Sequence, residues 1–336
     1  MKMRRLLLLV VGLVLMVSAI AQAPANYYDA AEGLTGDALK VALHDIIKGH
    51  TSIDYSQLWN AFWSTDNKGD GVVWDMYSDI PGGTPSYTFD MGVDQCGSDH
   101  CGSEGLCYNR EHSWPQSWFK KQSTPRTDLH HIFPTDCLVN YDRADNPYGE
   151  VRSGTTYSNG SKLGPCKTPG YSGTVFEPID EYKGDFARAF FYMSVRYYSE
   201  DTQWKTTDMT DKAVIKPWAM TMLLRWHELD PVSQKEIDRN NVIYNDYQHN
   251  RNPFIDHPEF AEMIWDPTWS VSEESDQANP RWMVVYDLCG RKIMQTDIMN
   301  EYDATTSLKN ELKQGCYVLM MMEGNRVVAR RKLLVN

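Results

Sequence analysis

The sequence runs Asn109-Arg-Glu-His-Ser-Trp-Pro115 and, after a short interval, Asp128-Leu-His-His-Ile-Phe-Pro-Thr-Asp-Cys-Leu-Val-Asn-Tyr-Asp-Arg143, and these two segments decide the fold around them. Residues 128–133 alternate as a strand does. Pro134 then stands where a helix would begin, because its fixed φ suits the first helical turn and its missing N–H costs nothing there. The pattern predicts a β-hairpin followed directly by a helix.

Side chains with useful chemistry gather on this hairpin and helix. Glu111 offers a hard oxygen ligand, Asn140 offers a second, neutral oxygen, and His112 is suited to take up a proton near neutral pH. Asp136, Asn140 and Arg143 are spaced to share one helix face, which would present a metal ligand beside a phosphate-binding guanidinium. A metal-assisted phosphodiester hydrolase needs these parts.

The histidines leave a second interpretation open. His112, His130 and His131 could supply three nitrogen ligands to a zinc ion. Adjacent strand residues point to opposite faces, which argues against His130 and His131 binding one ion. The same rule applies to Glu111 and His112. They can serve one site only if the strand ends or bulges there, as the following Ser113-Trp-Pro115 allows.

The start of the chain has the form of a secretory signal. Residues 1–21 combine a basic start, an apolar run and a small-residue cleavage site at Ala19-Ile-Ala21. We interpret them as a cleaved signal peptide. The alternative is an N-terminal membrane anchor, but the run is shorter than the roughly 18 to 20 residues of a spanning helix.

An exported chain enters an oxidising environment, so its seven cysteines can form disulfides. Because seven is an odd number, at least one thiol is expected to stay free or to pair between molecules. The spacings of Cys96, Cys101 and Cys107 do not match a tight zinc hook, which favours a disulfide over a structural metal there.

The charge balance argues against a tight binder of nucleic acid. The formal net charge is -12, residues 1–21 carry three positive charges and residues 281–336 carry +3, which leaves -18 on residues 22–280. An enzyme that grips a phosphate through a divalent metal does not need a basic surface, although electrostatic steering would be weak. Lys120, Lys121 and Arg126 form the one basic cluster near the hairpin segments.

At 336 residues the chain is long enough for more than one domain. Thr35-Gly-Asp37 is expected to cap a helix that ends at Gly49, and further helices are expected over residues 180–198, 216–229 and 232–244. Apolar and aromatic residues at helical spacing predict that the first two helices pack in the core: Leu39, Leu43, Ile46, Ile47, Phe186, Phe190, Met193 and Tyr197.

Two polar segments are expected to be connections. Asp66-Asn-Lys-Gly-Asp-Gly71 superficially resembles a calcium loop, but Lys68 occupies a ligand position, so a solvated turn is expected. Residues 270–280 have no large apolar side chain apart from Val271, and we interpret them as a linker between domains.

Short strands are expected beyond the linker, over residues 282–286, 291–295, 316–322 and 327–334, in a small β-sandwich or meander. This region resembles the C-terminal sorting domain of proteins exported by the type IX secretion system. The resemblance rests on residues 285–292, residues 312–319 and the basic, apolar end at residues 330–335. It implies passage across the outer membrane. The alternative is an ordinary β accessory domain, such as a carbohydrate binder.

Residues 27 to about 266 resemble the endonuclease I family, secreted or periplasmic nucleases of the His-Me finger class. The resemblance covers nearly the whole first domain and rests on residues 27–29 and 33–36, Cys107-Tyr-Asn-Arg-Glu-His112, Asp128-Leu-His-His131 with Pro134, Asn140-Tyr-Asp-Arg-Ala-Asp-Asn146, and residues 176–178, 184–189 and 250–254.

The resemblance implies roles for single residues. His112 would be the general base, Glu111 and Asn140 would hold Mg²⁺ (or Mn²⁺ or Ca²⁺), and Arg143 would be a catalytic phosphate contact. It also implies that Cys96 pairs with Cys107 and that His131 is a supporting residue rather than a metal ligand.

The expected fold is α+β. A ββα-metal (His-Me finger) core lies in a largely helical nuclease domain over residues 22–269, the linker spans residues 270–280, and a small all-β domain covers residues 281–336.

The expected protein is a monomer that is secreted or carried to the cell surface through the periplasm. It would cut DNA, with RNA as a further candidate, without sequence preference and leave 5′-phosphate ends. Two alternatives from other classes remain, a zinc-dependent hydrolase and a non-catalytic surface adhesin.

Overall fold

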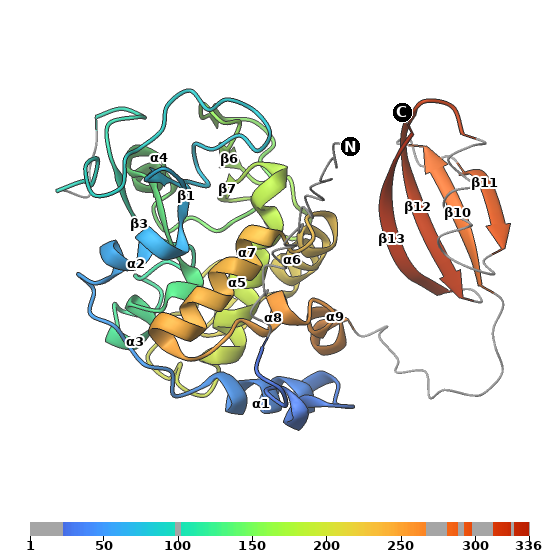
Figure 1. Ribbon diagram of the computed structural model, residues 1–336, viewed down its shortest axis with the longest axis horizontal. Helices are drawn as coiled ribbons and strands as arrows, with labels where there is room; N and C mark the ends of the chain where they lie inside the picture. Colours follow the sequence, from blue (N-terminus) through green and yellow to red (C-terminus); the bar gives the residue numbers. More distant parts are fainter. Residues whose placement is uncertain are drawn as a thin grey trace, which may run out of the picture. The chain divides into compact units, whose positions relative to one another are not determined.

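The computed structural model describes residues 23–97, 102–266, 281–287, 292–297, 312–323 and 326–335. The chain divides into two compact units, Met1–Trp269 and Ser270–Asn336 (Figure 1). Helices and small antiparallel sheets occur together, so the fold class is α+β, as expected. The expected signal peptide and linker lie outside the described residues. Among the helices that are described, none has the length and apolar character needed to cross a membrane.

Helices are the main regular structure of the first unit, and α5 (Lys183–Arg196) lies at its centre, packed against α1, α6 and α8 (Figure 1). The expected aromatic stripe is in the core, but every other residue of α5 is buried as well. Buried arginines on this helix are compensated by ion pairs, such as Arg188 with Glu236. The other helices are α1 (Gly36–Ile47), α2 (Leu58–Thr65), α3 (Ser123–Arg126), α6 (Pro217–Leu229), α7 (Gln234–Val242), α8 (Pro253–Asp256) and α9 (Phe260–Trp265), with 3-10 turns η1 (Asp29–Ala31), η2 (Leu129–His131) and η3 (Asp180–Tyr182) and the π-helical turn η4 (Ile243–Gln248).

Three small sheets lie around these helices. They are β1 (Asn67–Gly69) with β2 (Val72–Val73), β5 (Thr155–Thr156) with β6 (Lys162–Pro165) and β7 (Thr174–Glu177), and β8 (Thr210–Asp211) with β9 (Val214–Ile215). The calcium-like segment forms the β1–β2 hairpin. Its first residue, Asp66, is buried and receives a 3.0 Å bond from the Arg239 guanidinium, so the expected turn is present but this end of it is not solvated.

A fourth small sheet, the hairpin of β3 and β4, positions the candidate site. Strand β3 (Tyr108–His112) pairs antiparallel with β4 (Ile132–Asp136), with Glu111 opposite Phe133 and His112 opposite Ile132, and α4 (Cys137–Arg143) follows β4 directly. Strand β3 ends at His112, which is the condition under which Glu111 and His112 could serve one site.

The prediction that the helix after this hairpin begins at Pro134 was wrong. Residues 129–131 form η2, Pro134 lies inside β4, and α4 begins only at Cys137. Strand β4 tolerates the proline because it pairs with β3 alone, and a proline is acceptable in a strand with one unpaired side. The Asp136 side chain accepts a 3.0 Å bond from the Val139 N–H, so Asp136 is the N-cap of α4 and not a residue of its exposed face.

In the second unit four strands lie within one or two residues of their expected positions. They form one antiparallel sheet in the order β11 (Lys292–Asp297), β10 (Arg281–Asp287), β12 (Gly315–Glu323) and β13 (Arg326–Val335). Met283, Val285, Leu319 and Val335 pack together on it. Within the described part of this unit the strands belong to one sheet and do not form the two facing sheets of a sandwich.

Cys96 and Cys107 form a disulfide with a Cα–Cα distance of 5.2 Å, which confirms the expected pair. Cys166 is a buried free thiol, so the expectation that one cysteine stays unpaired is also confirmed. The sulfur atoms of Cys96, Cys107 and Cys137 lie within 4.8 Å of one another. Because the first two are bonded to each other, this group is a disulfide site and not a metal hook.

Candidate active site

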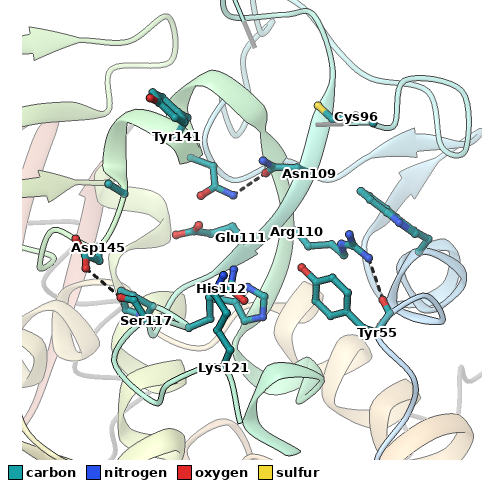
Figure 2. A pocket seen from close by; sticks show the side chains of 16 residues that line it. Tyr55, Cys96, Asn109, Arg110, Glu111, His112, Ser117, Lys121, Tyr141 and Asp145 are labelled. Atoms are coloured by element: carbon teal, nitrogen blue, oxygen red, sulfur yellow. Dashed lines mark hydrogen bonds between the residues drawn. The ribbon is translucent and has the colours of Figure 1, made fainter. Parts of the chain in front are cut away.

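The hairpin and α4 border a cleft of about 420 Å³, which lies within the size range of ligand-binding sites in proteins. Glu111, His112 and Asn140 all line it, although Asn140 follows the other two by almost thirty residues in the chain (Figure 2). The antiparallel pairing of β3 and β4 brings the start of α4 back beside β3 and so brings these three side chains together.

Glu111 is buried and held by two donors. Its Oε1 accepts a 2.8 Å bond from the Tyr77 hydroxyl and a 2.7 Å bond from the Arg143 guanidinium. Both bonds use the same oxygen, so Oε2 is the carboxylate oxygen available to a ligand in the cleft. Burial raises the pKa of the Glu111 carboxyl, while the Arg143 charge and the hydrogen bonds act in the opposite direction.

His112 is held in one tautomer. Its Nε2 lies 3.1 Å from the Arg126 carbonyl oxygen, and because a carbonyl only accepts, Nε2 carries the hydrogen. The lone pair of the neutral ring is then on Nδ1. Burial, with a smaller contribution from nearby His131, lowers the pKa of His112 to about 3. The imidazole is therefore neutral at physiological pH, with one ring nitrogen unprotonated.

Asn140 is oriented by a hydrogen bond to Asn109 on strand β3. Its Nδ2 donates a 2.6 Å bond to Oδ1 of Asn109, which leaves the Asn140 Oδ1 as the atom available to a ligand. Asn140 lies in the first turn of α4, next to the cap made by Asp136. The cap and the Asn109 contact together fix both the backbone and the amide of this residue.

Arg143 does not reach the cleft, and this corrects the expected phosphate contact. Its side chain is fully buried, and its guanidinium donates to Glu111 Oε1 at 2.7 Å, to the His112 carbonyl at 3.0 Å and to the Ser113 carbonyl at 2.8 Å. The group also lies 4.4 Å from the ring of Tyr148. Arg143 thus holds Glu111 and the end of β3 from behind, so it is a positioning residue.

The histidines do not form a zinc site. The Nε2 of His131 contacts the Pro125 carbonyl at 2.6 Å, and the Nε2 of His130 contacts the Asn250 carbonyl at 3.3 Å. In the described ranges, the one group of three or more His, Cys, Asp or Glu donors close enough to share an ion is the cysteine group above. The His131 ring lies 5.6 Å from the His112 ring, which agrees with a supporting role.

Sequence reasoning missed several residues that surround the site. Arg110, Tyr55 and Trp59 line the cleft, as does Tyr141. Strand alternation could have identified Arg110, because it lies two residues before His112 on β3 and so on the same face. Nothing in the local sequence marks Tyr55 or Trp59, since they reach the cleft from a loop and helix far upstream.

The expected basic cluster is only partly at the site. Lys121 lines the cleft, Lys120 is exposed, and the Arg126 guanidinium stacks on the Tyr55 ring at 3.9 Å.

Comparisons with known proteins identify the family that this chain resembles. The model of the Endonuclease I family matches residues 35–259. The chain is 41% identical over 252 residues to an extracellular ribonuclease of Bacillus amyloliquefaciens, covering 71% of this chain and 78% of the relative. It is 39% identical to an extracellular ribonuclease of Bacillus subtilis (strain 168) over the same shares. It is also 24% identical over 137 residues to an Endonuclease-1 of Buchnera aphidicola subsp. Acyrthosiphon pisum (strain APS), covering 40% of this chain and 47% of the relative.

Proposed function

Since the chain belongs to the endonuclease I family and is therefore a nuclease, a hydrolase of phosphodiester bonds, we propose that hydrolysis takes place in the cleft around Glu111, His112 and Asn140. The observation that carries this proposal is the convergence of these three side chains on one cleft, each held by a separate hydrogen bond. A non-catalytic adhesin does not explain such an arrangement, and membership of a nuclease family argues against it.

The donor set fits a hard divalent cation. Glu111 Oε2 and Asn140 Oδ1 are the oxygen atoms that their other contacts leave available, and Mg²⁺ is typically held by one or two such oxygens with water in the remaining positions. Mn²⁺ and Ca²⁺ also take oxygen ligands, whereas Zn²⁺ favours nitrogen and sulfur. When bound, the cation would supply stabilisation of the negative charge on the scissile phosphate and the departing oxygen.

His112 is the base of the proposed reaction. Its neutral ring takes a proton at Nδ1 from the attacking water, while the Nε2–H bond to the Arg126 carbonyl keeps the ring in place. The water oxygen forms a bond to phosphorus as the bond to the 3′ oxygen breaks. The departing 3′ oxygen takes a proton from solvent water and His112 later releases its proton to solvent, so the products are a 5′-phosphate and a 3′-hydroxyl. Arg143 holds the Glu111 carboxylate in position throughout. We place β3, β4 and α4 in the ββα-metal, or His-Me finger, class on this basis.

The proposed substrate is nucleic acid without sequence preference, because contacts to phosphate and sugar carry no base information. DNA is the substrate inferred from the sequence. The two Bacillus relatives are named ribonucleases, which supports including RNA.

We further propose that the protein is exported. The form of residues 1–21 supports this, as do relatives that are named extracellular. The resemblance of residues 281–336 to a sorting domain supports passage across the outer membrane by the type IX machinery.

Metal dependence is the direct test. Purified protein is incubated with supercoiled plasmid and with RNA, first in EDTA and then after addition of Mg²⁺ or Zn²⁺, and the product ends are identified by 5′-phosphate-dependent ligation. We expect no cutting in EDTA, recovery with Mg²⁺ and ligatable 5′ ends. Full recovery with Zn²⁺ but none with Mg²⁺ would instead support the zinc hydrolase.

A further inference from the structure

Aromatic side chains lie on both sides of the proposed catalytic residues Glu111 and His112. Figure 2 shows Tyr141 on one side of Glu111 and Tyr55 with Arg110 on the other. Tyr141 is 52% exposed, and Trp63 is 48% exposed; these are the two exposed aromatic side chains among the described residues. Trp63 lies outside the cleft, whereas Tyr141 lines it and follows the metal-ligand candidate Asn140 in α4.

Arg110 forms a fixed cationic surface on the opposite wall. Its guanidinium lies 3.8 Å from the Tyr55 ring centre and 4.4 Å from the Trp59 ring centre, and its Nη1 donates a 3.0 Å bond to the Tyr55 carbonyl. Two aromatic rings and a backbone acceptor hold the planar guanidinium in one orientation at the cleft wall. It is suited to contact a phosphate or a sugar of a bound strand.

The cleft has too little positive charge to bind through phosphates alone. Within the described ranges, its charged lining residues are two cations, Arg110 and Lys121, and two carboxylates, Glu111 and Asp145. Residues 22–280 as a whole carry a charge of -18. Binding driven by counterion release needs several cations, so beyond the contact between the proposed metal and one phosphate the cleft needs another interaction to hold a strand. Stacking of bases on aromatic rings is the interaction that the lining offers.

Resting on the proposed function, we propose that the cleft binds an unpaired nucleic-acid strand, with one base stacked on Tyr141 and the backbone passing Arg110 on the other side of Glu111. The bases of a duplex are already paired and stacked within the helix. A base could stack on Tyr141 only after it had left the duplex, which costs free energy. Single strands and unpaired regions are therefore the preferred substrates, whether DNA or RNA.

The test compares one labelled oligonucleotide as a single strand and as the corresponding duplex, in Mg²⁺ and at fixed salt. The wild type is expected to have the higher kcat/KM on the single strand. Tyr141→Ala is expected to lose about 5- to 100-fold in kcat/KM on the single strand, mainly through KM, and to change little on the duplex. Tyr141→Phe keeps the ring and should retain wild-type values. Trp63→Ala is the matched control, and it should leave both substrates unaffected.

A single abasic nucleotide in the strand gives a second measurement. The wild type should cut poorly at one phosphodiester at a fixed distance from the abasic position, because that cut needs the missing base on Tyr141. Tyr141→Ala should show no such gap in its cutting pattern.

The results separate this inference from the proposed function. Equal losses on single strand and duplex, or no loss in Tyr141→Ala, would overturn the stacking role while leaving the nuclease assignment in place. If the wild type cut neither substrate in Mg²⁺, or if His112→Ala cut both as well as the wild type, the proposed function itself would fail.

Discussion

Arg143 illustrates what residue type and spacing predict and what they do not. The helix spacing correctly placed Asn140 on the cleft, but it gave no information about what packs against the next turn of α4. There the carboxylate of Glu111 and two backbone carbonyls receive the Arg143 guanidinium. Glu111, His112 and Asn140, which line one cleft, could be selected from the sequence because their proposed chemistry depends on their own functional groups. The direction of Arg143 depends on contacts between segments that are distant in sequence.

A first prediction concerns this buried ion pair. Arg143→Met leaves the buried Glu111 carboxylate without its partner, so we expect the free energy of unfolding to fall by about 3–5 kcal/mol and nuclease activity to be lost. Arg152→Met, at an exposed arginine, is the matched control and should stay within about 0.5 kcal/mol of the wild type. Chemical denaturation measures both. An Arg143→Met protein of unchanged stability with a raised KM would indicate that Arg143 contacts phosphate after all.

A second prediction concerns the pH dependence of stability. Burial lowers the pKa of His130 to about 4, below the value of about 6.5 for an exposed histidine. Below pH 6.5 the unfolded chain binds a proton that the folded chain does not, so this contribution to stability is complete above pH 6.5 and is lost as the pH falls toward 4.

His130→Gln removes the titrating group. Between pH 7 and pH 5 the free energy of unfolding of the wild type should therefore fall more steeply than that of the variant. The two slopes should differ by up to about 1.4 kcal/mol per pH unit. Parallel curves for the two proteins would contradict a buried, neutral His130.

At the scale of elements, the hairpin and the helix were predicted from the sequence, but the boundary between them was not. Pro134 suggested a helix start because proline favours the first turn, yet the chain continues as β4 to Asp136. The helix begins after Asp136 because the Asp136 side chain caps the N–H of Val139, and its Oδ2 also accepts a 2.8 Å bond from the Gly105 N–H. A local preference of proline is weaker than a cap that is supported by tertiary contacts.

A third prediction follows for this cap. Asp136→Ala removes both bonds at the start of α4, so we expect a loss of about 1–2 kcal/mol in stability together with a reduced kcat, because Asn140 lies in the same helical turn. Asp136→Asn retains a good capping group and should keep most of the stability. If Asp136→Ala had wild-type kcat, α4 would not need this cap to position Asn140.

At the scale of the whole molecule, the cleft combines side chains from segments that no local pattern connects. Tyr55 and Trp59 come from around the start of α2, whereas Tyr141 belongs to α4. Periodicity predicted that α5 is a core helix, since its aromatic residues recur at helical spacing. It could not predict that Arg188 is buried too, because its ion-pair partner Glu236 lies on another helix, α7. The side chains that would contact the substrate come together only in the tertiary fold. The sequence alone therefore indicates the type of reaction more clearly than the type of substrate.

A fourth prediction concerns the two units. Because Met1–Trp269 contains every residue of the cleft, deletion of residues 281–336 should leave nuclease activity of the purified protein intact. In a host with the type IX machinery, the same deletion should retain the protein inside the cell envelope. Activity and the extracellular fraction are measured on the same preparations. A truncated protein that still reached the medium would contradict the sorting role.

The central claim is that His112 is the base of a phosphodiester hydrolase, and single-turnover hydrolysis of an end-labelled strand in Mg²⁺ tests it most directly. His112→Ala is compared with the wild type and with His249→Ala, at an exposed histidine outside the cleft, after thermal unfolding has shown that all three are folded. We expect His112→Ala to be slower by about 10²- to 10⁴-fold and His249→Ala to match the wild type. A folded His112→Ala protein that cuts within a few-fold of the wild-type rate would contradict the claim.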